Sequence, residues 1–324
     1  MSRNSFRELQ SKFQDPMIGC AIRALVFARV RIEEARVSKD EIRGHESVVG
    51  HHSITLAADK VSNAAIMDVL SYEFPDLRFI SEEDDDDPRR DAMLVKKDDL
   101  PRLRELSMVA IVDPICGTAG LQTDHYEVSI SIGIMHPREE KLVFIGGAAF
   151  APNVHGGMLI ASRAGQGVFV AKGIYTKTST IEVPKPLKRA QDKRYIEVGP
   201  DIFTMPRYSR FLLEFSRKVR TTNASGSCPL GIMKVIAGMT DALVQPHQKV
   251  VDWAGMYPAL IEAGGAWIFY HYREGFPVRM EEPDILSFAP GDERNTAFIA
   301  AGSEECAEWL WSMLLENWNQ SVIP

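Results

Sequence analysis

Two neighbouring strand-length segments restrict how this chain can fold, because both mix apolar residues with small ones. Residues 127–135 read EVSISIGIM and residues 142–150 read LVFIGGAAF. The middle of the first, ISIGI, alternates isoleucine with serine and glycine, which is typical of a strand whose sheet is packed on both faces. The chain has 324 residues, of which 45% are hydrophobic, so it can bury the large core that such a sheet needs.

The rest of the sequence predicts alternating helices and strands, as in an α/β protein. In the first half we predict helices over 5–36, with a break at Pro16, and over 58–75, strands at 77–83, 108–112 and 157–162, and a hairpin over 164–173. The acidic stretch 84–106 is expected to be a loop with a short helix. In the second half we predict strands at 194–198, 241–245, 266–270 and 296–300, and helices at 206–219, 229–238, 252–263 and 303–316.

Residues 174–192 are rich in Lys, Thr and Pro and contain no long apolar run, which is typical of a boundary between domains. We therefore predict an N-terminal α+β domain over residues 1–190 and a C-terminal α/β domain over residues 191–324.

The composition argues against several classes of protein. A net charge of −7 makes a nucleic-acid scaffold or a binder of anionic membranes a poor fit, although a bound metal could still attract a small anionic substrate. The four cysteines are far apart and form no CxxC pair, so neither a zinc knuckle nor a redox dithiol is indicated, and a reducing compartment is expected.

The N-terminus has charges where a signal peptide needs an apolar core, and no run approaches the roughly 18 apolar residues of a membrane span. We expect a soluble, cytoplasmic protein.

Acidic residues stand out in three segments that are far apart in the sequence. The first contains Asp59 and then Glu82-Glu83, the second reads DPICGT from Asp113, and the third reads VVDWAGMYPALIEAGG around Asp252. A strand that delivers a carboxylate to a glycine-containing turn is a common way to hold a metal or a phosphate, and Cys116 falls in that turn. Taken alone, Asp252 is explained as the N-cap of a helix that ends at Gly264-Gly265.

Together these segments resemble the signature motifs of the inositol monophosphatase superfamily, which also contains fructose-bisphosphatases and nucleotide bisphosphate phosphatases. The family pattern is an Asp on a helix, then Glu-Glu, then Asp-Pro-Ile/Leu-Asp-Gly-Thr/Ser, then Trp-Asp-x-Ala followed by Glu-Ala-Gly-Gly. Their order and approximate spacing match over residues 55–303. The segment GSCPLGIMKVIAGMTDALV at 226–244 is similar to the one that precedes the last Asp of the family.

The resemblance implies a layered αβαβα sandwich, a homodimer and a magnesium-dependent phosphomonoesterase. The substrate would be a small sugar, polyol or nucleotide phosphate, attacked directly by a metal-activated water without a phosphoenzyme. Magnesium prefers oxygen ligands, and two metals can activate the water and stabilise the leaving oxygen. The family holds two or three Mg²⁺ ions, and Mn²⁺ or Zn²⁺ are alternatives here.

Residue roles carry over by the same resemblance. Glu82, Asp113 and the Ile115 carbonyl would hold the first metal, and Asp113, Asp252 and residue 116 the second. Thr118, helped by Asp59, would orient the attacking water, so that Glu82, Thr118 and Asp59 are the expected catalytic residues. The backbone of Cys116, Gly117 and Thr118 would bind the phosphate. The expected substrate-binding residues are Gly226, Ser227, Cys228, Gln245, Lys249 and Asp252.

Position 116 departs from the family pattern, because Cys116 stands where the motif has its second Asp. A thiol is a poor ligand for magnesium and prefers softer ions. Four readings are open: a weakened second metal beside one strong one, binding without turnover, recruitment of zinc or another soft ion, and a nucleophilic thiol of lowered pKa. A small apolar filler and an engineered substitution are further explanations.

The residues expected near the substrate also depart from the family pattern. Gln245 stands where inositol-phosphate members carry a Glu, and Cys228-Pro229 stand where small Ala residues are usual. Leu56-Ala57-Ala58 replaces a segment with a hydroxyl, and Val251 stands where Trp is usual, with Trp253 after the Asp. We therefore expect a substrate other than inositol monophosphate itself.

Other polar residues receive ordinary explanations. His51-His52 and Asp124-His125 lack a second ligand pair at useful spacing and are read as surface or loop residues, and the acids at 84–87 as a solvated loop. Lys249 would suit a second anionic group on the ligand.

The competing function is a non-catalytic relative that binds a phosphorylated metabolite or a partner protein. A third is a lyase or transferase that uses the same phosphate pocket.

Overall fold

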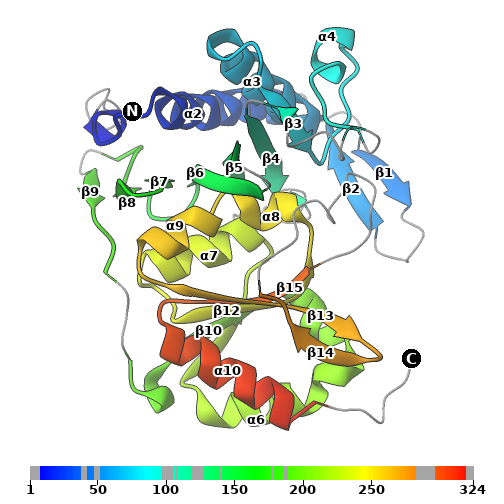
Figure 1. The fold of residues 1–324 in the computed structure, drawn as a ribbon, viewed down its shortest axis with the longest axis vertical. Helices are drawn as coiled ribbons and strands as arrows, with labels where there is room; N and C mark the ends of the chain where they lie inside the picture. Colours follow the sequence, from blue (N-terminus) through cyan, green and yellow to red (C-terminus); the bar gives the residue numbers. More distant parts are fainter. Residues whose placement is uncertain are drawn as a thin grey trace.

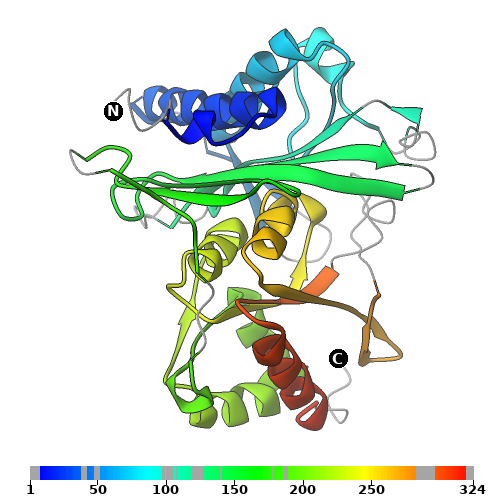
Figure 2. The same ribbon diagram turned by 60° about the vertical axis from the view of Figure 1, so that its left-hand side comes forward.

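The computed structural model describes residues 8–37, 42–46, 52–96, 99, 105–106, 108–118, 127–138, 141–176, 179–185, 189–281 and 296–318. Its elements form five layers, in the order helices, sheet, helices, sheet, helices, stacked along the long axis of the molecule (Figure 1 and Figure 2). This is the layered αβαβα sandwich expected from the sequence, so the predicted fold class is confirmed.

The first sheet has seven strands in the order β3-β4-β5-β6-β7-β8-β9. β3 and β4 are parallel, and each later strand is antiparallel to the one before it. A separate hairpin pairs Ile42–Glu46 (β1) with His52–Leu56 (β2). The strands of the sheet are Arg78–Ser81 (β3), Val109–Cys116 (β4), Ser129–Arg138 (β5), Lys141–Ala151 (β6), Met158–Arg163 (β7), Gly167–Lys172 (β8) and Thr180–Glu182 (β9).

The second sheet has six strands in the order β11-β10-β12-β15-β13-β14. β10 is parallel to both of its neighbours, and the other pairings are antiparallel. Its strands are Tyr195–Val198 (β10), Thr221–Ala224 (β11), Ala242–Gln248 (β12), Ala266–Arg273 (β13), Phe276–Arg279 (β14) and Thr296–Ala301 (β15).

Helices cover both faces of each sheet (Figure 1). α2 and α3 cover the outer face of the first sheet, α7, α8 and α9 lie between the two sheets, and α6 and α10 cover the outer face of the second, with a buried apolar cluster at each level. None of the helices in the described part of the chain has the length and apolar character that a membrane crossing requires. The α-helices are Pro16–Val37 (α2), Ala57–Glu73 (α3), Pro88–Asp91 (α4), Ser209–Lys218 (α6), Cys228–Ile236 (α7), Val250–Ala254 (α8), Tyr257–Glu262 (α9) and Glu304–Glu316 (α10), and the 3-10 turns are Gln191–Lys193 (η2), Pro200–Thr204 (η3) and Pro206–Tyr208 (η4).

The predicted single helix over 252–263 is wrong, because the chain forms two short helices there, α8 and α9, with a break at Gly255 and Met256. The backbone at the break presses onto β6: a Cβ built on Gly147 would lie 2.2 Å from the Gly255 carbonyl oxygen. Pro258 lies in the first turn of α9, where its missing N–H prevents the preceding helix from running on. The glycine on β6 therefore lets the middle helices approach the sheet, which agrees with the two-sided packing predicted for it.

Most other predicted elements are confirmed to within a few residues, and the misses are strands of unusual sequence. β1, β2, β9, β11 and β14 are not predicted from the sequence. β1 and β2 form a two-stranded hairpin, and β9, β11 and β14 are edge strands, of which β9 and β11 are polar. β4 continues to Cys116, beyond the predicted end at 112. The proline and the turn residues of the motif interrupt the apolar run, so the sequence pattern does not reveal this extension.

The predicted division at residue 190 stays a prediction, although the first sheet ends at Glu182 and the second begins at Tyr195 along the chain. His51 and the Asp124-His125 pair, read as surface or loop residues, lie outside the described residues, and His52 is described only as part of β2.

Replacing Gly147 with Ala is expected to lower the free energy of unfolding by roughly 1–3 kcal/mol, because the added methyl group would overlap a backbone carbonyl. Gly19→Ala is the matched control: its methyl group, in α2, would meet only the end of the Arg23 side chain at 3.9 Å, and alanine favours a helix. Urea denaturation followed by circular dichroism measures both. A Gly147→Ala protein as stable as the wild type would contradict the close contact.

Candidate functional site

The site is built where β4 leaves the first sheet and enters a tight turn. The pairing of β4 with β5 shifts register between Asp113 and Cys116, which bends the strand locally. Gly117 follows with a φ of 90°, and a Cβ there would lie 2.7 Å from the Glu127 carbonyl oxygen. Only glycine fits this position. Cys116 is therefore the last residue of the strand, and its expected place inside the turn is corrected.

The Asp113 carboxylate is fully buried at the end of this strand. Neither of its oxygens has a hydrogen-bond partner among the described residues. Burial, reinforced by the Asp252 and Glu82 carboxylates, raises the pKa of Asp113 well above its usual value. A buried carboxylate without a partner is costly unless it is protonated or meets a cation.

Asp252 reaches the same place from α8, which belongs to the middle helix layer. It is the third residue of the helix, and its Oδ2 accepts a hydrogen bond of 2.8 Å from the Lys249 backbone N–H. The reading of Asp252 as an N-cap is therefore wrong, because Lys249 occupies that position. Burial and the Glu82 carboxylate raise the pKa of Asp252 to about 7, although Lys249 acts in the opposite direction.

Cys116 completes a compact group with these two acids. One ligand atom from each of Asp113, Cys116 and Asp252 lies within 4.8 Å of the others. The Cys116 Sγ also accepts a hydrogen bond of 3.3 Å from the Cys228 backbone N–H at the start of α7. Burial, followed by the Asp113 and Asp252 charges, raises the pKa of the Cys116 thiol well above its usual value. This environment favours a neutral thiol, whereas a nucleophilic cysteine needs a lowered pKa.

Thr118 and Asp59 lie together, as expected from the family pattern. The Thr118 Oγ1 is 3.2 Å from Asp59 Oδ1 and 3.1 Å from the Ile115 carbonyl oxygen. Asp59 comes from the first turn of α3 and is buried, and the Ser62 hydroxyl on the same helix donates to the Pro114 carbonyl oxygen at 2.7 Å. α3 therefore braces the turn after β4. Residues 119–126 lie outside the described residues.

Glu82, the expected ligand of the first metal, is bound by a lysine. The Lys249 ammonium donates to Glu82 Oε1 at 2.6 Å. Partial burial disfavours the charged lysine, but Glu82, Asp252 and Asp113 outweigh it and raise the pKa of Lys249. The Lys249 side chain remains 55% exposed, so the pair adds little to stability. The contact places a positive charge beside Glu82. From the sequence we instead expect Lys249 to bind an anionic group of the substrate.

The expected substrate-binding residues lie at the start of α7 and on β12. Gly226 and Ser227 border the Gly117 turn, since a Cβ on Gly117 would lie 3.2 Å from the Gly226 carbonyl oxygen and 3.2 Å from the Ser227 Cβ. The Ser227 hydroxyl is 2.8 Å from that of Ser129 on β5. Gln245 is buried on β12 and its Oε1 accepts a hydrogen bond of 3.2 Å from Gln248 Nε2. The start of α7 is thus next to the turn, and the described contacts of Gln245 are on its own strand and at Gly199.

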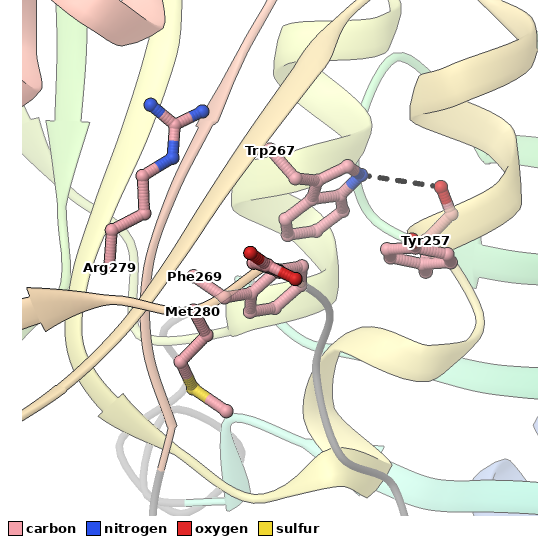
Figure 3. Close-up of a pocket in the computed structure, with 6 residues that line it drawn as sticks. Tyr257, Trp267, Phe269, Arg279 and Met280 are labelled. Atoms are coloured by element: carbon pink, nitrogen blue, oxygen red, sulfur yellow. Dashed lines mark hydrogen bonds between the residues drawn. The ribbon is translucent and has the colours of Figure 1, made fainter.

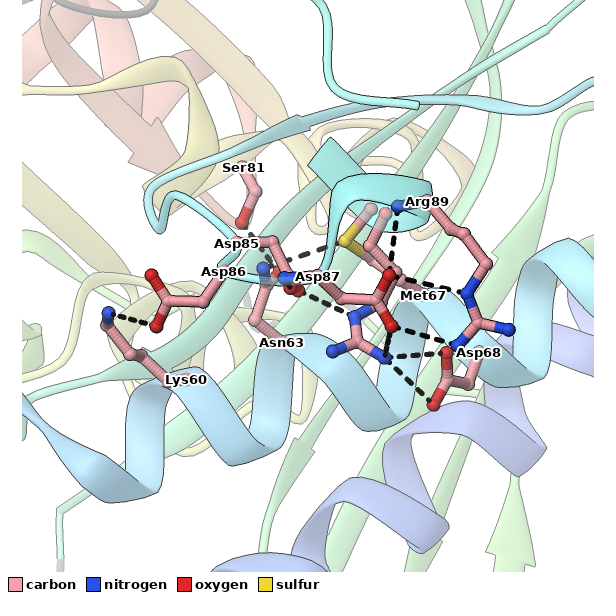
Figure 4. Close-up of polar contacts among 10 residues, drawn as sticks. Lys60, Asn63, Met67, Asp68, Ser81, Asp85, Asp86, Asp87 and Arg89 are labelled. Atoms are coloured by element: carbon pink, nitrogen blue, oxygen red, sulfur yellow. Dashed lines mark hydrogen bonds and ion pairs between the residues drawn. The ribbon is translucent and has the colours of Figure 1, made fainter. Parts of the chain in front are cut away.

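The acids at 84–87 lie in a loop, as read from the sequence, with Asp84 and Asp86 exposed, but three of the four contact basic residues (Figure 4). Asp85 accepts a hydrogen bond of 2.7 Å from Arg90 Nε, and only 6% of its side-chain surface is exposed. Asp86 pairs with Lys60 at 3.1 Å, and Asp87 caps α4 by accepting from the Arg89 backbone N–H at 2.9 Å. The basic residues that follow the acids in DDDDPRR were the available sequence signal for this network.

A second hollow lies on the far side of the middle helices and contains none of the expected site residues (Figure 3). Its volume is about 430 Å³, and Trp267 and Phe269 stack there with ring centres 5.2 Å apart. The Trp267 Nε1–H donates to the Tyr257 carbonyl oxygen at 3.3 Å. Trp253 packs into the same aromatic group, which explains why an aromatic residue follows Asp252 instead of preceding it. The lining residues are Tyr257, Trp267, Phe269, Arg279, Met280 and Glu281.

The donor set at the end of β4 fits a divalent cation. The unpartnered oxygens of Asp113 and the neighbouring Asp252 are hard ligands, and such oxygens suit Mg²⁺ or Mn²⁺. The Cys116 sulfur is a softer donor beside them. The Glu82–Lys249 contact is the feature that sequence reasoning missed, because it joins residues 167 positions apart.

The raised pKa of Asp252 makes the stability of the ion-free protein depend on pH. Between the ordinary pKa of 3.8 and about 7 the folded state keeps a proton that the unfolded state has lost, so the free energy of unfolding falls as pH rises through this range. Chelator-treated protein should therefore be more stable at about pH 5.5 than at about pH 8. Urea denaturation measures this, and Asp252→Asn should reduce the slope. Greater stability at the higher pH would contradict it.

Comparison with known proteins agrees with this geometry. The model of the inositol monophosphatase family matches residues 14–312. The structure is similar to inositol monophosphate-bound SaIMPase-II (21% identity over 93% of this chain and 94% of that chain, TM-score 0.62) and to 2′AMP-bound SaIMPase-II (20%, 92% and 97%, 0.60). It is also similar to the extragenic suppressor protein suhB from Bartonella henselae (18%, 95% and 100%, 0.67).

At these identities the solved structures show a common fold, and no curated protein sequence matches the chain. The family model, in contrast, covers most of the chain and includes every residue of the group around Asp113. The protein belongs to the inositol monophosphatase family.

Proposed function

We propose that this protein is a metal-dependent phosphomonoesterase that acts on a small sugar, polyol or nucleotide phosphate. The observation that carries the proposal is the buried, unpartnered Asp113 carboxylate, which lies beside Asp252. Family membership supports a metal-dependent phosphatase, and the oxygen donors support Mg²⁺ or Mn²⁺ as the ion. A bound cation would offset the cost of burying the Asp113 carboxylate beside the partly buried Asp252.

The ion would be held by Asp113 and Asp252, with the Ile115 carbonyl and Cys116 nearby. When bound, a divalent cation polarises a phosphoryl oxygen and lowers the pKa of a coordinated water. The chain's own contribution is to bind the phosphate and to position the attacking water. We assign phosphate binding to the backbone N–H groups at Gly117 and Thr118, because glycine leaves this turn without a covering side chain.

We assign the orientation of the attacking water to Thr118 and Asp59. A Thr118 hydroxyl that donates to Asp59, 3.2 Å away, keeps a lone pair with which to accept a hydrogen bond from the attacking water. As the water loses its proton to the Thr118 oxygen, the original Thr118 hydroxyl proton can pass to the buried Asp59 carboxylate, so that Thr118 remains neutral. In this proposal Glu82 affects the charge of the site through its contact with Lys249.

The substrate class is kept broad for a structural reason. SaIMPase-II, with the same fold, has been seen with inositol monophosphate and with 2′AMP, which supports polyol and nucleotide phosphates as candidates. At the substrate end this chain has Gln245 and Cys228, and both side chains are buried. We propose that these residues, with Gly226 and Ser227, direct the enzyme away from inositol monophosphate itself.

A second candidate is a protein that binds a phosphorylated ligand without turning it over. Two features favour it: burial raises the pKa of the Cys116 thiol, which favours its neutral form, and Lys249 contacts the expected metal ligand Glu82. Either would weaken the binding of a second ion. A phosphate could still bind at Gly117 and Thr118 in such a protein.

We further propose a cytoplasmic homodimer. Homodimers are common in the family, and the four cysteines are all free, which supports a reducing compartment.

Phosphate release from a panel of sugar, inositol and nucleotide phosphates tests the proposal, with Mg²⁺, Mn²⁺ and Zn²⁺ compared. We expect activity with Mg²⁺ or Mn²⁺, and an increase of about tenfold or more in kcat/KM for Cys116→Asp, because the change restores a hard oxygen ligand. Activity with Zn²⁺ alone would make the Cys116 sulfur a ligand. A silent panel, with a phosphorylated compound still raising the melting temperature, would favour the binding protein.

The assignment of Thr118 gives a sharper test. Thr118→Val removes the hydroxyl at constant volume and should lower kcat by roughly 10²–10³-fold while the affinity for metal is kept. Thr176→Val is the matched control, since its hydroxyl also bonds a carbonyl three residues back, at 2.9 Å, in a turn remote from Asp113. Equal kcat for wild type and Thr118→Val would remove Thr118 from the mechanism.

A further inference from the structure

Lys249 holds two acids of the site at once. Its backbone N–H donates to Asp252 at 2.8 Å, and its ammonium donates to Glu82 at 2.6 Å. Asp252 and Lys249 belong to the start of α8, whereas Glu82 follows β3 in the first sheet. The backbone contact with Asp252 places Lys249 beside the acids, and from there its ammonium reaches Glu82. A positive charge thus lies within the group.

The charges of the group favour one divalent ion over two. The Lys249 ammonium adds a positive charge beside Glu82, and Cys116 adds no charge as a thiol, where an aspartate would add a negative one. The acids that remain are Glu82, Asp113, Asp252 and the Asp59 carboxylate next to Thr118. Both differences remove negative charge with which the group could attract a second divalent cation.

The available ligands also indicate a single bound ion. Two ions that share Asp113 require a free Glu82 on one side and a hard ligand at position 116 on the other. Lys249 engages Glu82, and position 116 is a thiol. Among the described residues, the compact group that remains is Asp113, Cys116 and Asp252. Its carboxylate oxygens are hard donors sufficient to begin the coordination of one divalent ion.

We propose that the Lys249 ammonium takes the place of one metal ion, so that each chain binds one divalent cation, between Asp113 and Asp252. The inference rests on the proposed metal centre and deepens it. Lys249 is a positioning residue here: it neutralises Glu82 and keeps that carboxylate from recruiting an ion. The expected use of Lys249 for a second substrate anion is replaced by this role.

Counting bound Mn²⁺ tests the proposal directly. Ion-free protein is titrated with Mn²⁺, and the free ion is measured by its electron paramagnetic resonance signal. We expect one tightly bound Mn²⁺ per chain in the wild type and two in Lys249→Met, because methionine keeps the length of the side chain and releases Glu82. The double variant Lys249→Met/Glu82→Gln should return to one. Lys172→Met, which removes a lysine paired with Glu182 far from Asp113, should still bind one.

Two Mn²⁺ ions in the wild type, or one in a folded Lys249→Met, would overturn the proposal. The wild-type count decides even where the variant fails to fold. Phosphate release, assayed separately, distinguishes this inference from the proposed function. A wild type that binds one ion and releases no phosphate from any substrate would support the one-ion centre and sink the phosphatase. A wild type that binds no ion would overturn both.

Discussion

The burial of the Asp113 carboxylate, whose oxygens accept no hydrogen bond from the part of the chain that the structure describes, is the constraint on which the rest of the site depends. Such a group is unfavourable by several kcal/mol if it is charged and alone. The fold must either keep the acid protonated or provide a cation. Burial and the surrounding acids favour the protonated form, but that form becomes progressively costlier to keep as pH rises. The neighbouring Asp252, with its pKa near 7, shares this condition. A divalent ion relieves both residues at once, and this is the physical reason to read the group as a metal centre.

The layered sandwich brings these acids together because its middle helices pack against the first sheet within the core that lies between the two sheets. α8 carries Asp252 and Lys249 and lies against the first sheet, from which Asp113 and Glu82 project. Its close approach needs a strand surface without side chains, and Gly147 supplies it opposite the Gly255 carbonyl. A methyl group there would hold the break after α8 away from the sheet. The packing of small residues far from the chemistry therefore sets the distance between the two halves of the site.

Cys116 and Lys249 change the site in the same direction. The thiol removes one negative charge and the ammonium adds one positive charge, so the centre attracts fewer cations than four free carboxylates would. Each change is modest alone, since thiols are tolerated near metals and a half-exposed ion pair stabilises little. Their combination defines a centre of lower ion capacity, and Thr118, Asp59 and the Gly117 turn keep an arrangement able to bind and orient a phosphate.

The sequence alone determined the fold class, most helices and strands, and the acids Asp59, Asp113 and Asp252, because these depend on local periodicity and on motifs that occur in a fixed order. It did not locate polar edge strands such as β11, whose residues carry no apolar pattern, or the break between α8 and α9, where Pro258 is a local signal but the contact with β6 fixes the position. Nor could it pair Lys249 with Glu82. Only the tertiary structure decided that contact, because no local pattern links residues that far apart, and the packing of one sheet against the middle helices brings them within 2.6 Å.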